Sequence, residues 1–170
     1  MLTIVIGGAG SGKSAFAEKH VCTLPGRKIY LATMLPRDGE SRARVSRHRA
    51  QRAYLGFETL ERGLDLAGAE IPADANVLLE DLSNLLANEI YEAEGGGMDA
   101  ACRGLEHLIA SCRNLTVVTN EVFSGGADYD AESLRYMHAL ADLNRWLAMR
   151  ADLAVEIVCG LPNVLKGELP

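Results

Sequence analysis

Short runs of consecutive apolar residues recur along the chain and are separated by longer segments with helical spacing of apolar positions. A short apolar run without polar alternation is typical of a strand buried on both faces of a parallel sheet. Leu2 to Ile6, which stops at Gly7, is the clearest example. Further strands are predicted over residues 28–32, 57–60, 76–80 and 115–119, and a last one over 153–158.

The segments between these runs predict helices over residues 14–21, 38–53, 82–92, 99–112 and 131–149. Strands that alternate with helices indicate an α/β fold with a mainly parallel sheet and helices on both faces. Residues 1–170 contain no repeat, low-complexity stretch or linker. A single domain over 1–170 is therefore expected.

The composition excludes several classes of protein. Apolar residues make up 48% of the 170 residues, which is ordinary for a globular protein and sufficient for a core. A formal net charge of −6 argues against a general affinity for nucleic acid. No apolar run approaches the roughly 18 residues of a membrane span, and the first run is too short for a secretory signal. These features predict a cytoplasmic protein.

The cysteines and histidines show no metal or disulfide pattern. Cys22, Cys102, Cys112 and Cys159 stand far apart and form no CxxC motif. In a chain of this length such spacing predicts reduced, mostly buried thiols. The four histidines are equally scattered, without the spacing of a zinc site.

A glycine-rich segment follows the first predicted strand and leads directly into the first predicted helix. It reads Gly7-Gly8-Ala9-Gly10-Ser11-Gly12-Lys13-Ser14. Its glycines let backbone N–H groups point at phosphate oxygens, and the following helix adds its free N–H groups and dipole. Lys13 is placed to reach the β- and γ-phosphates, and the Ser14 hydroxyl to bind Mg²⁺. The sequence thus predicts a P-loop NTPase-type three-layer fold that binds a nucleoside triphosphate.

Acidic residues end two of the predicted strands. Glu80 and Asp81 follow Val77 to Leu79, and Glu121 follows the strand that ends at Thr119. P-loop enzymes hold Mg²⁺ or its waters with a carboxylate at such a position, and ligands collect at the carboxyl ends of parallel strands. Glu80 is the preferred candidate, ahead of Asp81, and Glu121 is a second candidate. Glu80 alternatively starts the following helix as an acidic residue.

A strongly basic segment surrounds His48. Its arginines are Arg42, Arg44, Arg47, Arg49 and Arg52. On a helix, Arg44, His48 and Arg52 share one face, and so many like charges favour an anionic partner such as the phosphates of a nucleotide. A neutral imidazole among arginines is a competent nucleophile toward phosphorus. The residues alone favour a solvated basic helix with an ordinary surface histidine.

The order of these motifs resembles one family over residues 2 to about 166. It is carried by IVIGGAGSGKS, YLAT at 30–33, RVSRHRAQR at 44–52, FETLE at 57–61, VLLE at 77–80, VVTNEV at 117–122, LNRWLA at 143–148 and GLPNVLK at 160–166. The chain is similar to the bifunctional adenosylcobinamide kinases/adenosylcobinamide-phosphate guanylyltransferases of cobalamin biosynthesis.

This resemblance implies two reactions. Adenosylcobinamide is phosphorylated with ATP or GTP, and GMP from GTP is then transferred to adenosylcobinamide phosphate through a covalent guanylyl-histidine. His48 takes the place of that histidine. The family contacts the nucleotide at positions that correspond here to Gly7–Ser14, Ala32, Thr33, Met34, Arg49, Ala50, Gln51, Arg52, Glu61 and Glu80. The family also implies a homotrimer.

Two other functions remain compatible with the residues. One is a small-molecule kinase with a single activity, in which the arginines clamp phosphates and no covalent intermediate forms. The other is a binding or regulatory subunit that switches with bound nucleotide and only hydrolyses it slowly.

Overall fold

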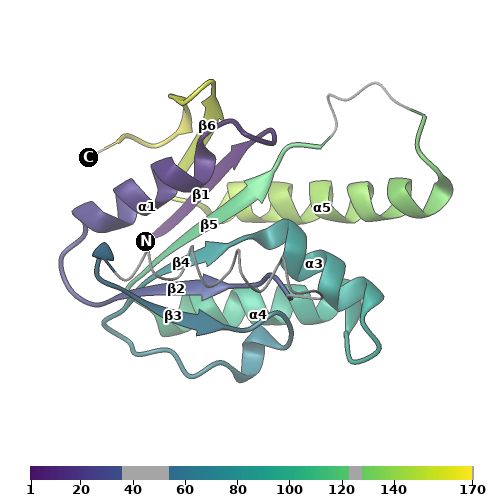
Figure 1. Ribbon diagram of the computed structural model, residues 1–170, viewed down its shortest axis with the longest axis horizontal. Helices are drawn as coiled ribbons and strands as arrows, with labels where there is room; N and C mark the ends of the chain where they lie inside the picture. Colours follow the sequence, from purple (N-terminus) through teal and green to yellow (C-terminus); the bar gives the residue numbers. More distant parts are fainter. Residues whose placement is uncertain (36–53, 123–127, 170) are drawn as a thin grey trace.

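The computed structural model describes residues 1–35, 54–122 and 128–169, which form a seven-stranded sheet with helices on both faces (Figure 1). The first half contains β1 (Leu2–Gly7), α1 (Lys13–Thr23), β2 (Lys28–Ala32), β3 (Phe57–Glu61), the 3₁₀ turn η1 (Leu66–Gly68) and β4 (Asn76–Glu80). The second half contains α3 (Leu82–Tyr91), α4 (Gly97–Ser111), β5 (Asn114–Asn120), α5 (Ala131–Arg150), β6 (Leu153–Val158) and β7 (Leu161–Lys166).

The strand order is β3-β2-β4-β5-β1-β6-β7, and every pairing is parallel except that of β6 with β7. The phosphate-loop strand β1 therefore lies between β5 and β6, and β5 separates it from β4. The carboxyl ends of β1, β4 and β5 meet at one edge of the sheet, where α/β proteins bind ligands. The predicted α/β fold with a mainly parallel sheet is confirmed.

Two apolar cores lie on opposite faces of the sheet because successive strand residues point to opposite sides. Ile4 of β1 packs in the larger core, which α3, α4 and α5 cover. Its neighbour Val5 packs in the smaller core, together with Ala17 and Val21 of α1. The unbroken apolar runs of the sequence follow from this burial on both faces, and they position the strand ends rigidly.

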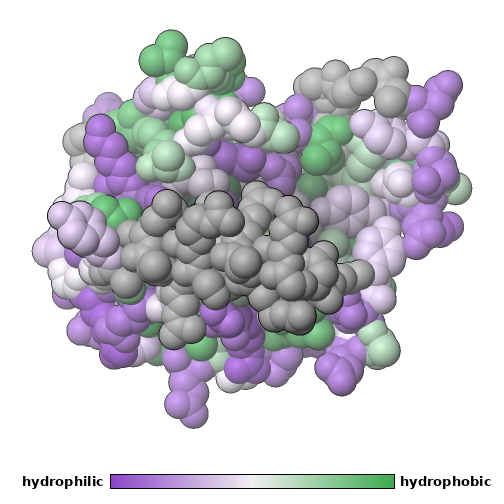
Figure 2. All heavy atoms as spheres, viewed as in Figure 1, coloured by the Kyte–Doolittle hydropathy of each residue, from purple (hydrophilic) through white to green (hydrophobic). Residues whose placement is uncertain are grey.

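The strand β7 was not predicted, and the expectation that 153–158 is the last strand was wrong. All six residues of β7 are exposed, so the strand lacks the apolar pattern of a core element, and Pro162 interrupts it. A tight turn with positive φ at Cys159 and Gly160 reverses the chain from β6 into β7. Figure 2 shows exposed apolar residues over this hairpin, at the top of the view, and Leu161 is 71% accessible.

The four cysteines are free thiols. The expectation of mostly buried cysteine side chains was wrong, since Cys22, Cys102 and Cys112 are only partly buried and Cys159 is exposed.

The basic helix predicted over 38–53 lies outside the described residues. No helix in the described ranges combines the length and the apolarity that crossing a membrane requires.

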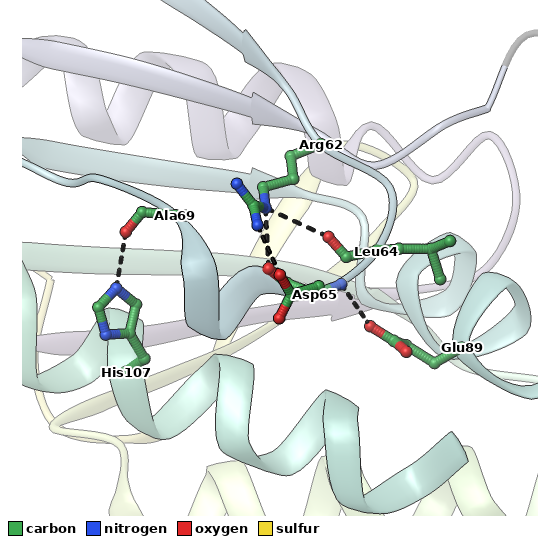
Figure 3. A network of polar contacts seen from close by, with 6 residues as sticks. All are labelled: Arg62, Leu64, Asp65, Ala69, Glu89 and His107. Carbon is green, nitrogen blue, oxygen red and sulfur yellow. Dashed lines mark hydrogen bonds and ion pairs between the residues drawn. The ribbon is translucent and has the colours of Figure 1, made fainter. Parts of the chain in front are cut away.

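The connection from β3 to β4 is tied to the helices beneath it by the network in Figure 3. The buried carboxylate of Glu89 in α3 accepts the backbone N–H of Asp65 at 2.8 Å and that of Gly96 at 2.9 Å. Arg62 pairs with Asp65, and the imidazole of His107 in α4 lies 2.8 Å from the carbonyl oxygen of Ala69. The segment that leaves β3 is thereby fixed against α3 and α4.

We expect Glu89→Ala to lower the free energy of unfolding by about 3 kcal/mol, because two backbone N–H groups lose the buried carboxylate that accepts from them. Urea unfolding checks this value, and the exposed Glu106→Ala in α4 serves as a matched control with a change near zero. Equal losses in the two variants would contradict a specific role of Glu89.

Candidate active site

The loop between β1 and α1 has the backbone geometry of a phosphate cradle. Gly10 and Gly12 have φ values of 71° and 93°, which residues with a side chain rarely adopt. Helix α1 begins at Lys13 directly after this turn, and no side chain caps its first N–H groups. These donors and the positive end of the helix dipole remain available for an anion.

The Lys13 side chain folds back over the loop. It is only 8% exposed, and its ammonium donates to the carbonyl oxygen of Gly8 at 3.1 Å. An ammonium has three N–H donors, and the one backbone hydrogen bond leaves others that can donate to phosphate oxygens. The predicted position of Lys13 in the phosphate site therefore has a geometric basis.

The β6–β7 turn holds the other side of the loop. The backbone N–H of Gly160 donates to the carbonyl oxygen of Ser11 at 2.8 Å, and a Cβ on Gly12 would lie 3.3 Å from the Cα of Gly160. A cavity of about 320 Å³ opens between this turn and the loop, and Glu121 and the exposed Cys159 line it. Sequence reasoning missed the turn, although the Cys-Gly pair after the β6 run marks a tight reversal.

Glu80 and Ser14 meet beside the loop. The Ser14 hydroxyl donates to Oε1 of Glu80 at 2.6 Å, although the two residues lie 66 positions apart. The other oxygen, Oε2, has no accessible surface and no hydrogen-bond partner among the described residues. Desolvation by burial raises the pKa of Glu80 to about 7, and the hydrogen bond from Ser14 opposes the rise. A hydroxyl and a carboxylate oxygen without a partner fit the hard oxygen ligands that Mg²⁺ prefers.

This raised pKa predicts how stability depends on pH in the metal-free protein. Between pH 4.5 and about 7 the folded protein holds a proton on Glu80 that the unfolded chain releases, so the free energy of unfolding falls as pH rises through this window. The fall attributable to Glu80 is about 3 kcal/mol and is complete above pH 7. Urea unfolding in EDTA should show a shallower pH dependence for Glu80→Gln than for wild type. Parallel curves for the two proteins would contradict the assignment.

The other predicted nucleotide contacts that the structure describes lie along the same edge of the sheet. Ala32 at the end of β2 pairs with Glu61 of β3 on one side and with Glu80 of β4 on the other. Thr33 is fully buried, and its hydroxyl donates to the carbonyl oxygen of Asp81 at 2.7 Å and accepts the N–H of Asp81 at 2.8 Å. Met34 is exposed. Thr33 therefore connects the β2 end to the Glu80–Asp81 segment.

Asp81 belongs to a polar network that sequence reasoning missed. Its carboxylate caps α3 by accepting the N–H of Asn84 at 2.7 Å and is also hydrogen-bonded by the side chain of Asn120 at the end of β5. The Asn120 amide donates to the Ser83 hydroxyl at 2.7 Å. Burial raises the pKa of Asp81. The one sequence signal for this network was the TNEV segment, in which Asn120 immediately precedes the acidic candidate Glu121.

The structure brings Lys13, Ser14, Glu80 and Asp81 together and places Glu121 next to the loop, where its N–H donates to the carbonyl oxygen of Gly7 at 3.1 Å. His48 and the predicted contacts Arg49, Ala50, Gln51 and Arg52 lie outside the described residues. The described residues bring an ammonium, a hydroxyl and two carboxylates to the carboxyl edge of the sheet, which are the groups that a triphosphate and a cation would require.

Comparison with known proteins matches the chain to one family. The family described as cobinamide kinase / cobinamide phosphate guanyltransferase matches residues 3–165. The bifunctional adenosylcobalamin biosynthesis protein CobP of Pseudomonas aeruginosa is 31% identical over 172 residues, which cover 99% of each chain. The bifunctional adenosylcobalamin biosynthesis protein CobU of Salmonella typhimurium is 30% identical over 183 residues, which cover 98% of this chain and all of the relative. Among solved structures, the P4 protein of bacteriophage phi6 in complex with ADP gives a TM-score of 0.44 at 16% identity, over 96% of this chain and 52% of that one.

Proposed function

We propose, since this chain belongs to the cobinamide kinase / cobinamide phosphate guanyltransferase family, that it catalyses both reactions on adenosylcobinamide. It phosphorylates adenosylcobinamide with ATP or GTP and then transfers GMP from GTP to adenosylcobinamide phosphate. The products of the second reaction are adenosylcobinamide-GDP and pyrophosphate. The observation that carries the proposal is the contact between Ser14 and Glu80 directly beside the phosphate loop.

In both reactions the triphosphate lies in the loop from Gly7 to Ser14. The first N–H groups of α1 and the Lys13 ammonium balance its negative charge. Ser14 and Glu80 would hold Mg²⁺, which would supply charge neutralisation for the phosphates. Because the raised pKa of Glu80 reflects a buried carboxylate without a full set of partners, a cation at this position favours its ionised form.

In the kinase reaction the hydroxyl of the aminopropanol group of adenosylcobinamide attacks the γ-phosphorus. The bond from the γ-phosphorus to its bridging oxygen breaks, and the nucleoside diphosphate leaves. Lys13 stabilises charge on the transferring group, and the hydroxyl proton passes to solvent or to a nearby carboxylate. Asp81 lies at the strand end next to Glu80 and within electrostatic reach of Lys13.

In the guanylyl transfer, the neutral imidazole of His48 attacks the α-phosphorus of GTP, and the bond to the β-bridging oxygen breaks, so pyrophosphate leaves. A phosphate oxygen of adenosylcobinamide phosphate then attacks the same phosphorus, and the P–N bond breaks to restore His48. Two in-line displacements thus replace one difficult step. His48 takes this role by resemblance to the family.

The test is to supply purified protein with adenosylcobinamide, Mg²⁺ and either ATP or GTP. The proposal expects adenosylcobinamide phosphate with either nucleotide, and adenosylcobinamide-GDP with equimolar pyrophosphate only when GTP is present. Phosphorylation without any adenosylcobinamide-GDP would reduce the assignment to a kinase with a single activity. Nucleotide hydrolysis without either corrinoid product would favour a nucleotide-switched subunit.

We further propose that the chain assembles as a homotrimer in the cytoplasm, where ATP and GTP are available. The six exposed residues of β7 leave an unpaired edge strand with apolar side chains, which favours self-association. Light scattering should give a mass of three chains of 18.3 kDa. A mass of one chain at micromolar concentration would contradict this assembly.

A further inference from the structure

A second pocket lies between α3 and α5, and Val122, which follows the carboxyl end of β5, lines part of it. In Figure 1, α3 and the first turns of α5 lie at the edge of the sheet toward which β4 and β5 point. Its volume is about 470 Å³, within the usual range for small-molecule sites. Ala87 and Tyr91 of α3 form one wall, and Ser133 and Tyr136 of α5 form another.

Hydrogen bonds connect the pocket to the phosphate site. The Tyr136 hydroxyl donates to the carbonyl oxygen of Ser83 at 2.9 Å, and the Ser83 hydroxyl accepts from Asn120, which also bonds Asp81. Burial raises the pKa of Tyr136, and the charge of Asp81 adds to the rise. Asp81 therefore stands between the pocket and the Ser14–Glu80 pair.

The lining favours a neutral, largely apolar occupant. Three of the five tyrosines of the chain line the pocket, and no Lys, Arg, Asp or Glu does so among the described residues. Tyr91 and Tyr129 are 47% and 40% exposed, and the rings of Tyr91 and Tyr136 lie 6.3 Å apart. A nucleotide would need cations for its phosphates, whereas exposed aromatic faces with hydroxyl groups suit an apolar ring that carries amides.

A larger cavity among the described residues does not meet these conditions. Its volume is about 750 Å³, and it is lined by Arg27 and Ile29 at the start of β2 and by Ser111 at the end of α4. The starts of parallel strands lie at the opposite edge of the sheet from the phosphate loop. A molecule held there would not bring a hydroxyl to a phosphate bound by Lys13.

We propose that the pocket between α3 and α5 binds the aminopropanol arm and the adjoining apolar edge of the acceptor corrinoid, and presents its reacting group beside Asp81. This inference rests on the proposed function and adds the acceptor subsite to it. The pocket is too small for a whole macrocycle, so the rest of the ring lies outside it, over the exposed faces of Tyr91 and Tyr129.

The experiment fills the pocket from either wall with Ser133→Phe and Ala87→Phe. Ser111→Phe is the matched control, because it adds the same side chain to a helical serine in the larger cavity. Equilibrium dialysis with adenosylcobinamide alone measures the dissociation constant from the colour of the corrinoid, without turnover. We expect both pocket variants to weaken binding by about tenfold or more, and Ser111→Phe by less than about twofold.

Kinetics separate a lost acceptor site from a general defect. In the pocket variants the KM for adenosylcobinamide should rise, while the KM for GTP and the labelling of protein by GTP alone stay at wild-type values. The inference is overturned if wild type binds no corrinoid in dialysis, or if both pocket variants bind it as wild type does. A wild type that binds the corrinoid in this pocket but never phosphorylates it would instead overturn the proposed function.

Discussion

Lys13→Ala is expected to lower the rates of phosphorylation and of guanylyl transfer together, each by about 10²–10³-fold. Both reactions develop charge on phosphates in the same loop, and Lys13 is a buried cation that the fold places there, with its ammonium 3.1 Å from the Gly8 carbonyl oxygen. Initial rates at saturating nucleotide for the two reactions, measured on the same preparation, check this expectation.

Lys19→Ala is the matched control, because Lys19 lies on the same helix but is exposed. Its rates should remain near those of wild type, and a thermal unfolding scan should show that both variants are folded. If Lys13→Ala slows only one reaction, the two reactions do not share the loop, and a second triphosphate site has to exist.

His48→Ala is expected to abolish covalent labelling of the protein by GTP that carries the label at the α-phosphate. Guanylyl transfer should fall by about 10⁴-fold or more, because the variant lacks the nucleophile. The bound label in wild type should survive alkali and be lost in acid, which is the behaviour of a phosphoramidate.

His138→Ala, which changes an exposed histidine in α5, should retain the label. Unlabelled wild-type protein would remove the covalent intermediate from the mechanism and leave direct transfer between bound substrates. Label that persists in His48→Ala would move the nucleophile to another residue.

The sequence predicted those parts of the fold that depend on local pattern. The runs at 28–32 and 76–80 match β2 and β4 at both ends, because strands buried on both faces consist of consecutive apolar residues. The phosphate loop was equally readable, since its glycines, Lys13 and Ser14 are contiguous. The exposed strand β7 has no such pattern and was missed.

The network beside the loop was harder to predict because its members come together only through the order of the strands. Ser83 lies 37 positions from Asn120 and 53 from Tyr136, and each is an ordinary polar residue in its own segment. Glu80 was predicted as a site residue because it ends an apolar run, but its contact with Ser14 and its raised pKa depend on burial that a sequence does not display.

The contact between the β6–β7 turn and the phosphate loop joins the proposed nucleotide site to the exposed edge strand β7. The backbone hydrogen bond from Gly160 to Ser11 holds the loop against the exposed hairpin. If the proposed assembly forms through β7, a neighbouring chain that holds the hairpin would lower the conformational entropy that the loop loses when it binds phosphate. Occupancy of the loop and association at β7 would then strengthen one another by the same factor.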